Sequence, residues 1–282
     1  MRKFKELVFS VFLHTATALP LIALFSVIFF IISRGAMVIN WEFLTQMPRD
    51  AMTAGGIFPA IVGTFYLVLV AVFFALPLGV MAAIYLVEYT RQGGIVQTIR
   101  IGVSTLAGVP SVVFGLFGMV IFVRFFGFGV SILSGGLTLG IMILPTVIRT
   151  SEEALLAIPQ GFREASFALG ATKWQTIYRI VMPNSISSIL TGSILGIGRA
   201  AGDTASILFT AATFYIMHLP NSVFSEVQAL PYHIYGLLTE GTHAQAQIPI
   251  AYGTATVLLF LVLSMSALSI VMRNRFRRRK KW

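Results

Sequence analysis

The sequence predicts an all-α integral membrane protein with six transmembrane helices. Hydrophobic residues make up 57% of the 282 residues and charged residues only 11%, whereas soluble domains carry roughly 25% charged residues. Apolar stretches of the length that spans a bilayer core, about 20 residues, recur along the chain. Lys and Arg residues gather in alternate polar segments between these stretches, which is the pattern of a multi-pass protein.

The apolar stretches predict where the spans lie. The six expected spans are 11–33, 57–87, 99–123, 130–149, 184–214 and 249–272. The first is too long for the apolar region of a signal peptide and has no clear cleavage signal, so we interpret it as an uncleaved span. We expect Pro77 to kink the second span and Gly108-Val-Pro110 to interrupt the third.

The distribution of basic residues predicts the orientation. With the N-terminus in the cytosol, sixteen of the twenty Lys and Arg residues fall in inner segments, three in outer segments, and Arg199 within the fifth span. The opposite orientation would invert this bias, so both termini are expected to be cytosolic. We divide the chain into the first transmembrane helix with an outer loop (1–56), the main transmembrane domain (57–272) and a basic cytosolic tail (273–282).

Composition also argues against several classes of function. The net charge of +10 does not indicate nucleic acid, because seven basic residues lie in the tail, where they suit acidic membrane lipid. There is no cysteine, and the four histidines have no ligand spacing, so no metal site is expected. The dinucleotide-like pattern Gly196–Ala201 lies in an apolar helix and follows no strand. No Walker A sequence is present, so we expect this chain itself to bind no cofactor.

The inner loop at 150–183 is polar and has a helical pattern. Thr150 and Glu153 match a capping box that would open a short helix. Pro159 would end that helix and can open the next. Gly170 suits the position just after this second helix, where the backbone often turns left-handed.

A second capping box, Thr172-Lys-Trp-Gln175, predicts a further helix that stops before Pro183. The helix before it carries a stripe of small or apolar residues, Phe162, Ala165, Ser166 and Leu169. A compact helix–turn–helix of this kind would suit docking into a groove on a soluble partner. An amphipathic loop lying on the lipid surface explains the pattern equally well.

Two charges are expected inside the membrane. Arg199 and Asp203 are four residues apart in the fifth span, so we expect them to share one helix face. Burying a charge there costs about 2.5–3.5 kcal/mol on insertion scales, which marks such residues as functional candidates. They could form a structural ion pair, or Arg199 could line an anion path to which Arg149 adds a second positive site. Arg149 could equally be an ordinary anchor at the inner surface.

The inner loop resembles a known motif. Residues 164–170, followed after nine residues by Ile180-Val-Met-Pro183, resemble the EAA loop of ABC importer permeases. The positions that correspond to the motif by their spacing are Glu164, Ala165, Ser166, Gly170, Ile180 and Pro183. The residue types depart mildly from the motif at Ser166 and Met182. The resemblance implies the type I ABC importer permease fold. It also implies that the loop docks into a groove of an ATPase subunit, with ATP and Mg bound by that partner.

Four further segments, 106–118, 144–154, 202–210 and 229–235, resemble phosphate importer permeases, the last being the outer-loop signature of their A-type subunit. This resemblance implies an inorganic phosphate importer in the cell membrane of a prokaryote. The implied partners are a homologous C-type permease subunit, two ATPase subunits and an extracytoplasmic phosphate-binding protein.

The same resemblance places Arg149 and Arg199 on the family's membrane arginines and Asp203 on its carboxylate, which is Glu in the family. Ser206 replaces a Pro of the family, so a straighter local helix is expected. One alternative is a permease for another oxyanion, such as molybdate, tungstate or sulfate. Another is an ATPase-independent anion channel or secondary transporter. A membrane enzyme is disfavoured because no constellation of nucleophile, base and metal ligands is evident.

Overall fold

The computed structural model describes residues 2–91, 93–214, 216, 218–241 and 243–278, and it is mostly helical. Within these residues, five helices are long and apolar enough to cross a membrane, or six if one bent pair forms a single span. This confirms the predicted all-α membrane class. The long helices are α1 (Arg2–Gly35), α3 (Phe58–Ile84), α6 (Ile132–Leu156), α9 (Met182–Gly202) and α11 (Ala244–Arg278).

The third span is the bent one. It consists of α4 (Gly94–Ala107) and α5 (Ser111–Gly118), and α5 continues as the π-helix η3 (Met119–Phe125). The two halves are bent by 100°. Pro110 adopts an extended conformation before α5, with φ −58° and ψ 141°, because a proline and the residue before it disfavour a continuous helix. The predicted interruption at Gly108–Pro110 is confirmed.

The second span runs further than a simple helix. α3 continues through Pro77 and passes into the π-helix η2 (Tyr85–Tyr89) at its inner end. A π-turn is rare and often lies at functional sites. The predicted span at 57–87 is therefore confirmed, and its last turn has an unusual geometry.

α6 is longer than predicted, and the expected capping box at its inner end is wrong. Thr150 lies within α6, where its hydroxyl donates a hydrogen bond of 2.8 Å to the carbonyl of Thr146. A threonine inside a helix can bond back to the preceding turn in this way, so it does not start a new helix. α6 ends at Leu156, before Pro159.

The fifth span begins earlier than predicted. α8 (Lys173–Thr176), the π-helix η4 (Ile177–Val181) and α9 follow one another without a gap, and residues 173–202 qualify as one span. The expected stop before Pro183 is wrong, because Pro183 lies in the first turn of α9 directly after the π-turn. Proline lacks an N–H, and the first turn of a helix tolerates this loss.

The fifth span also ends earlier, at Gly202 rather than 214. The segment after it is irregular and closes over the first turn of α6. The N–H groups of Ser131, Ile132 and Leu133 donate to carbonyls of Thr210, Ser225 and Val223 at 2.9–3.0 Å. The first N–H groups of a helix have no partner within the helix, and this segment supplies them. Ser206 therefore lies in a turn region. The expected straighter helix at this position is wrong.

The segment between the fifth and sixth expected spans contains α10 (Leu230–Thr239), which includes most of the outer-loop signature at 229–235. The Leu230 N–H donates to the Thr64 hydroxyl of α3 at 2.8 Å, which ties α10 to the second span. His233 is 1% exposed, and burial lowers the pKa of its ring to about 4, so the ring is neutral at neutral pH. The outer-loop signature is thus a buried packing element.

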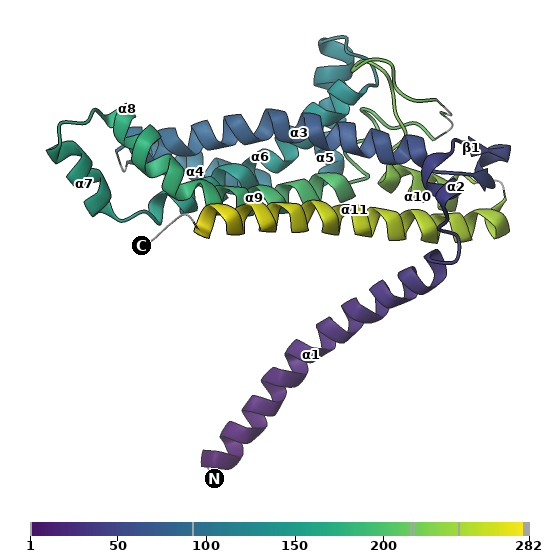
Figure 1. Cartoon of the computed structure of the whole chain (residues 1–282), viewed down its shortest axis with the longest axis horizontal. Helices are drawn as coiled ribbons and strands as arrows, with labels where there is room; N and C mark the ends of the chain where they lie inside the picture. Colours follow the sequence, from purple (N-terminus) through teal and green to yellow (C-terminus); the bar gives the residue numbers. More distant parts are fainter. Residues whose placement is uncertain (1, 92, 215, 217, 242, 279–282) are drawn as a thin grey trace.

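Short elements connect α1 to α3. They are α2 (Trp41–Thr45), the 3₁₀-helix η1 (Asp50–Met52) and two strands, β1 (Pro48–Arg49) and β2 (Ala54–Gly55), which pair antiparallel. The Asn40 side chain caps α2 by accepting the Phe43 N–H at 2.7 Å. These elements and α10 lie at one end of the bundle, and the α7–α8 region lies at the other end with the C-terminal end of α11 (Figure 1).

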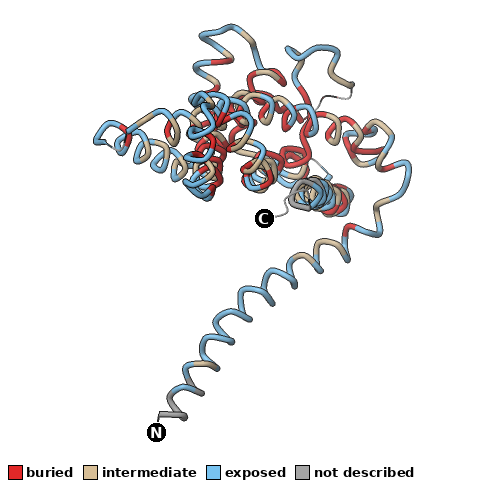
Figure 2. The backbone as a smooth tube through the Cα atoms, turned by 60° about the vertical axis from the view of Figure 1, so that its left-hand side comes forward, coloured by how far each residue is buried: buried red, intermediate tan, exposed pale blue. Residues whose placement is uncertain are grey.

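The bundle core lies where α3 packs against α6 and α9, and α11 packs on α9 and α10. α1 contacts α11 near the C-terminal end of α1. The rest of α1 extends away from the bundle and is exposed (Figure 2). None of its spanning window is buried within the chain. The predicted basic tail continues α11 as helix to Arg278, and residues 279–282 lie outside the described residues.

Close contact between α6 and α9 depends on Gly192. A Cβ at Gly192 would lie 2.0 Å from the Thr150 hydroxyl and 2.2 Å from its Cβ. Small residues let two membrane helices approach closely. Gly198, in the same helix, has more room, because a Cβ there would meet only Val262 at 3.7 Å.

We predict that Gly192→Ala lowers the thermal stability of the detergent-solubilised protein. Overpacking against Thr150 is expected to cost about 1–3 kcal/mol. Gly198→Ala is the matched control and should unfold at or above the parent temperature, since alanine favours the helix. Equal unfolding temperatures for the two variants would contradict the close α6–α9 contact.

Candidate functional site

The inner loop folds into a hairpin of two helical segments. α7 (Gln160–Ala168) runs out from the bundle, and α8 with η4 returns and continues into α9. We call residues 160–181 the α7–α8 hairpin. It protrudes from the bundle at the end opposite α10 (Figure 1).

Gly170 makes the turn of the hairpin possible. Its φ is +79°, in the left-handed region that favours glycine. Its N–H donates to the Phe167 carbonyl at 2.9 Å, and the Ala171 N–H donates to the Ser166 carbonyl at 3.2 Å. These two bonds form a Schellman motif, which satisfies the last carbonyls of α7. The predicted position of Gly170 after α7 is confirmed.

The second half of the hairpin starts as predicted. Both hydrogen bonds of a capping box join Thr172 and Gln175, and they satisfy N–H groups that the first turn would leave unpaired. The hairpin therefore has a defined stop and a defined start on either side of residues 169–172. Its turn is specified by local sequence alone.

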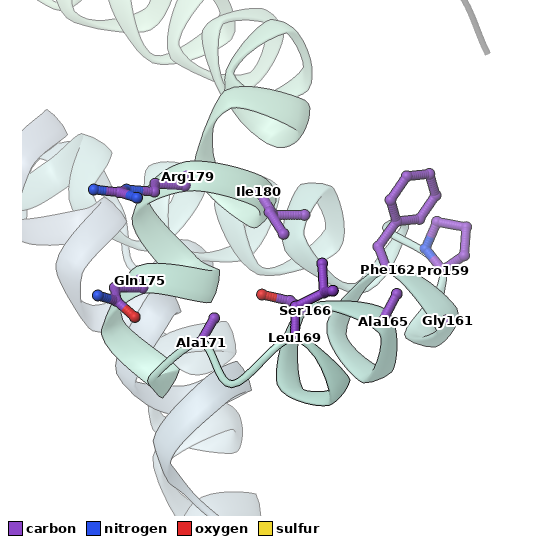
Figure 3. Close-up of a pocket in the computed structure, with 10 residues that line it drawn as sticks. All are labelled: Pro159, Gly161, Phe162, Ala165, Ser166, Leu169, Ala171, Gln175, Arg179 and Ile180. Carbon is purple, nitrogen blue, oxygen red and sulfur yellow. The ribbon is translucent and has the colours of Figure 1, made fainter.

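The two arms of the hairpin enclose an apolar groove of about 590 Å³. Figure 3 shows that residues from both arms point into it. Its lining includes Pro159, Phe162, Ala165, Ser166, Leu169 and Ile180. Leu169 is 89% exposed at the tip. The hairpin thus presents a concave apolar surface. Exposed apolar patches of this kind are typical of sites where a partner binds.

The residues that match the EAA motif do not all lie in the groove. Ala165, Ser166 and Ile180 line the groove, and Gly170 forms the turn. Glu164 is exposed on α7 and does not line the groove. Pro183 lies beyond the hairpin, in the first turn of α9.

Ser166 joins the two arms. Its hydroxyl lies 2.8 Å from the Thr176 hydroxyl, and both are buried. Thr176 donates its proton to the Thr172 carbonyl at 3.1 Å, so Ser166 is the donor between the two hydroxyls. The departure from alanine at this position therefore has a structural reason, because an alanine could not make this bond.

Arg163 anchors the hairpin to the bundle. Its Nε and Nη2 donate to Glu88 Oε1 at 3.0 and 2.8 Å. Nη1 also donates to the Ile158 carbonyl at 2.8 Å, and Nη2 to the Leu155 carbonyl at 3.0 Å. Both charged side chains are 9% exposed. Charge-assisted bonds of this geometry are stronger than neutral ones.

Sequence reasoning missed this pair. Arg163 was counted only as an inner positive charge, and Glu88 was not singled out. One signal was present, because Glu88 follows directly on an apolar span in a chain with only ten acidic residues. Its partner lies 75 positions away, a distance that no local pattern bridges.

A second contact joins η2, the element that contains Glu88, to α8 in the other arm of the hairpin. The Lys173 ammonium lies over the Tyr89 ring, 5.1 Å from its centroid. Such cation–π contacts contribute about 0.5–1 kcal/mol at exposed sites. Adjacent residues of η2 therefore contact α7 and α8.

The charges predicted inside the membrane are not brought together. Asp203 is not helical, with φ −79° and ψ 126°, and its carboxylate accepts the Ser206 N–H at 2.8 Å. A side chain that bonds its own following backbone ends a helix in this way. The expected shared face is therefore wrong, and across the described residues no ion pair joins Asp203 to Arg199.

Arg199 lies in the last turn of α9, where the helix dipole favours a positive charge. It is exposed, on one face of α9 with Ser188, Leu195 and Gly202. In the part of the chain that is described, its side chain has neither an ion pair nor a hydrogen bond. A membrane helix that exposes an arginine on such a face needs a polar environment or a partner there.

Arg149 lies elsewhere, at the inner end of α6. Its Nη1 donates to the Ser104 hydroxyl at 3.3 Å, and its Nε lies 4.0 Å from Glu153. With Arg100 and Glu152, which form an ion pair of 2.6 Å, it lines a small cavity of about 120 Å³. No hydrogen bond or ion pair of the described residues links Arg149 to Arg199.

Solved structures share this fold. A chain of a bacterial alginate ABC transporter, in complex with an alginate-bound periplasmic protein, matches with a TM-score of 0.64 and 16% identity. The match covers 95% of this chain and 94% of that one. A chain of the MetNI methionine ABC transporter matches with a TM-score of 0.60 and 17% identity, covering 78% and 97%. The fold and the hairpin define a permease subunit of the type I ABC importer class.

The chain belongs to the family of binding-protein-dependent transport system inner membrane components, which matches residues 75–282. It is 34% identical to phosphate transport system permease protein PstA 1 of Mycobacterium tuberculosis, over 99% of this chain and 91% of that protein. It is 32% identical to the probable ABC transporter permease protein YqgI of Bacillus subtilis, over 86% and 85%. It is 31% identical to a probable PstA of Methanocaldococcus jannaschii, over 94% and 92%.

We predict that Gly170→Ala loosens the turn of the hairpin, because a left-handed conformation costs a non-glycine residue about 1–2 kcal/mol. Hydrogen exchange of residues 160–181 should be faster in this variant. Gly161→Ala is the control, since a Cβ there meets nothing within 4 Å and no left-handed φ is required. Parent-like exchange in Gly170→Ala would contradict the role of the turn.

We predict that Arg163→Gln destabilises the protein by about 3–5 kcal/mol, because Glu88 would be left as a buried charge without its partner. The double variant Arg163→Gln/Glu88→Gln should recover part of this loss. Thermal unfolding in detergent measures both, with Arg91→Gln as a control at an exposed arginine. A double variant no more stable than the single one would show that the charges do not form the pair.

Proposed function

We propose that this chain is the A-type permease subunit of an ATP-driven inorganic phosphate importer in the cell membrane of a prokaryote. The observation that carries the proposal is the 34% identity, over nearly the whole chain, to a protein named as a phosphate transport permease. The apolar groove of the α7–α8 hairpin supports the ATP-driven part of it. A lipid-bound loop would need a flat apolar face, whereas this surface is concave and suits a protein partner.

The proposed partners follow from the same class. A homologous C-type permease subunit would complete the translocation path, and two ATPase subunits would bind ATP and Mg. A phosphate-binding protein would deliver the anion on the outer side. The exposed apolar length of α1 and the exposed face of α9 carrying Arg199 leave surfaces for a second membrane subunit.

The proposed mechanism assigns the hairpin to the transmission of force. ATP binding closes the ATPase pair. The ATPase subunit that binds this chain then moves the hairpin, which sits in a groove of that subunit. The helices would then shift between inward-open and outward-open arrangements, as rigid bodies do in domain closure. No ATP hydrolysis is expected on this chain.

Arg199 is the residue we assign to the anion path, with Arg149 as a second positive site nearer the cytosol. A guanidinium stays protonated and matches the oxygens of phosphate. The site must bind with moderate strength, because a tightly held anion would not be released. Asp203 is assigned to positioning, since its carboxylate holds the turn that follows α9.

The test is reconstitution in liposomes with a C-type subunit, the ATPase and the binding protein. We expect uptake of labelled phosphate that requires both ATP and the binding protein and that excess molybdate or sulfate does not inhibit. Uptake of labelled molybdate, tungstate or sulfate in place of phosphate would favour another oxyanion. Uptake by this chain without any ATPase would favour a channel or secondary transporter.

We predict that Arg199→Gln lowers phosphate uptake about 10- to 100-fold, since a hydrogen bond to a charged group contributes about 1.5–3 kcal/mol. Arg199→Lys keeps the charge and should retain more uptake than Arg199→Gln. Arg124→Gln is the control, because Arg124 is an exposed arginine of η3. Normal uptake in Arg199→Gln would exclude Arg199 from the anion path.

A further inference from the structure

The inner end of the second span contacts both arms of the α7–α8 hairpin through adjacent residues. Glu88 binds Arg163 of α7, and Tyr89 lies under Lys173 of α8. We propose that η2 is a clamp that carries the movement of the hairpin into α3, and that Glu88 and Tyr89 are its positioning residues. The proposal rests on the proposed function for the direction of the movement, but not for the identity of the cargo.

The clamp connects the hairpin to α3, and no covalent connection of the chain joins these two elements directly. The hairpin is joined covalently to α6 through residues 157–159 and to α9 through η4. α3 is joined to the hairpin only through space. Without such contacts, movement of the hairpin would reach α3 only through the packing of α3 on α6 and α9.

An apolar cluster beneath the ion pair strengthens the link. Ala83 of α3 packs in one cluster with Leu155, Ile158 and Val181, and Phe162 of α7 packs against this cluster. The Arg163–Glu88 pair is 9% exposed at both side chains. Water is therefore largely excluded, and a charge-assisted bond in such a place holds its geometry more firmly than one at the surface.

The fork of Arg163 ties three elements at once. It donates to Glu88 of η2, to the Leu155 carbonyl in the last turn of α6, and to the Ile158 carbonyl in the connection between α6 and α7. Because the guanidinium is planar and rigid, the three acceptors keep fixed relative positions. A shift of α7 must therefore either carry η2 with it or break these bonds.

The clamp is π-helical, and a second π-helix lies where the hairpin joins α9. η2 ends the second span, and η4 leads from the hairpin into α9. π-Turns have wider, less regular hydrogen bonding than α-helix and are frequent where helices serve a function. η2 and η4 therefore give the inner ends of α3 and α9 each a segment that can rewind without unfolding the long helix.

The experiment uses the whole reconstituted complex. Arg163→Gln/Glu88→Gln removes the pair without leaving a buried charge, and Tyr89→Leu removes the ring. We expect ATP hydrolysis to continue while the phosphate taken up per ATP falls at least about fivefold in the double variant, within the usual range of coupling between sites. Arg91→Gln is the control, since its side chain is exposed and lies just beyond the clamp.

A distance measurement separates failure of the clamp from failure of the proposed function. The chain has no cysteine, so spin labels at Gln160→Cys in α7 and Met81→Cys in α3 have no background. We expect one narrow distance, unchanged by ATP, with the clamp intact and a broad one in the double variant. A parent-like narrow distance or a parent-like uptake per ATP in the double variant would overturn the clamp. A parent complex that takes up no phosphate would overturn the proposed function, and the label distances would still decide the clamp.

Discussion

The position of the α7–α8 hairpin depends on one buried guanidinium. Helix α6 ends with carbonyls that have no partner within the helix, and the second span ends with a carboxylate that is costly to bury alone. Arg163 satisfies both, because its fork reaches Glu88 and the Leu155 carbonyl of α6, and it also bonds the Ile158 carbonyl just beyond the helix. A lysine could not, since it presents a point charge without a planar fork. The groove on the hairpin is held in place by this arrangement.

A second constraint acts at the opposite end of the bundle. Backbone groups in or near the membrane need partners within the protein, and the first turn of α6 obtains them from the carbonyls of Thr210, Val223 and Ser225. The fifth span must therefore end at Gly202, so that the chain can turn back over α6. This places Arg199 in the last turn of α9, near a helix end that favours its charge.

Local chemistry explains which parts of the fold could be predicted. The spans follow from apolar length, the orientation from basic residues, and the hairpin turn from Gly170 and the Thr172–Gln175 capping box. Predictions failed where a contact distant in sequence prevailed over a local signal. Thr150 matches a capping box, yet it lies inside α6 packed against Gly192 of α9. Asp203 is spaced to pair with Arg199, yet its carboxylate holds the Ser206 N–H.

The sequence by itself determined the membrane class, the number of apolar segments, the cytosolic side and the hairpin with its glycine turn. These features depend on composition and on interactions within about one helical turn. Only the tertiary structure decided the 100° angle of the break in the third span, the groove between the hairpin arms and the pairing of Glu88 with Arg163. Such features depend on which distant segments meet, because burial gives a charge or a carbonyl one partner that linear spacing cannot specify.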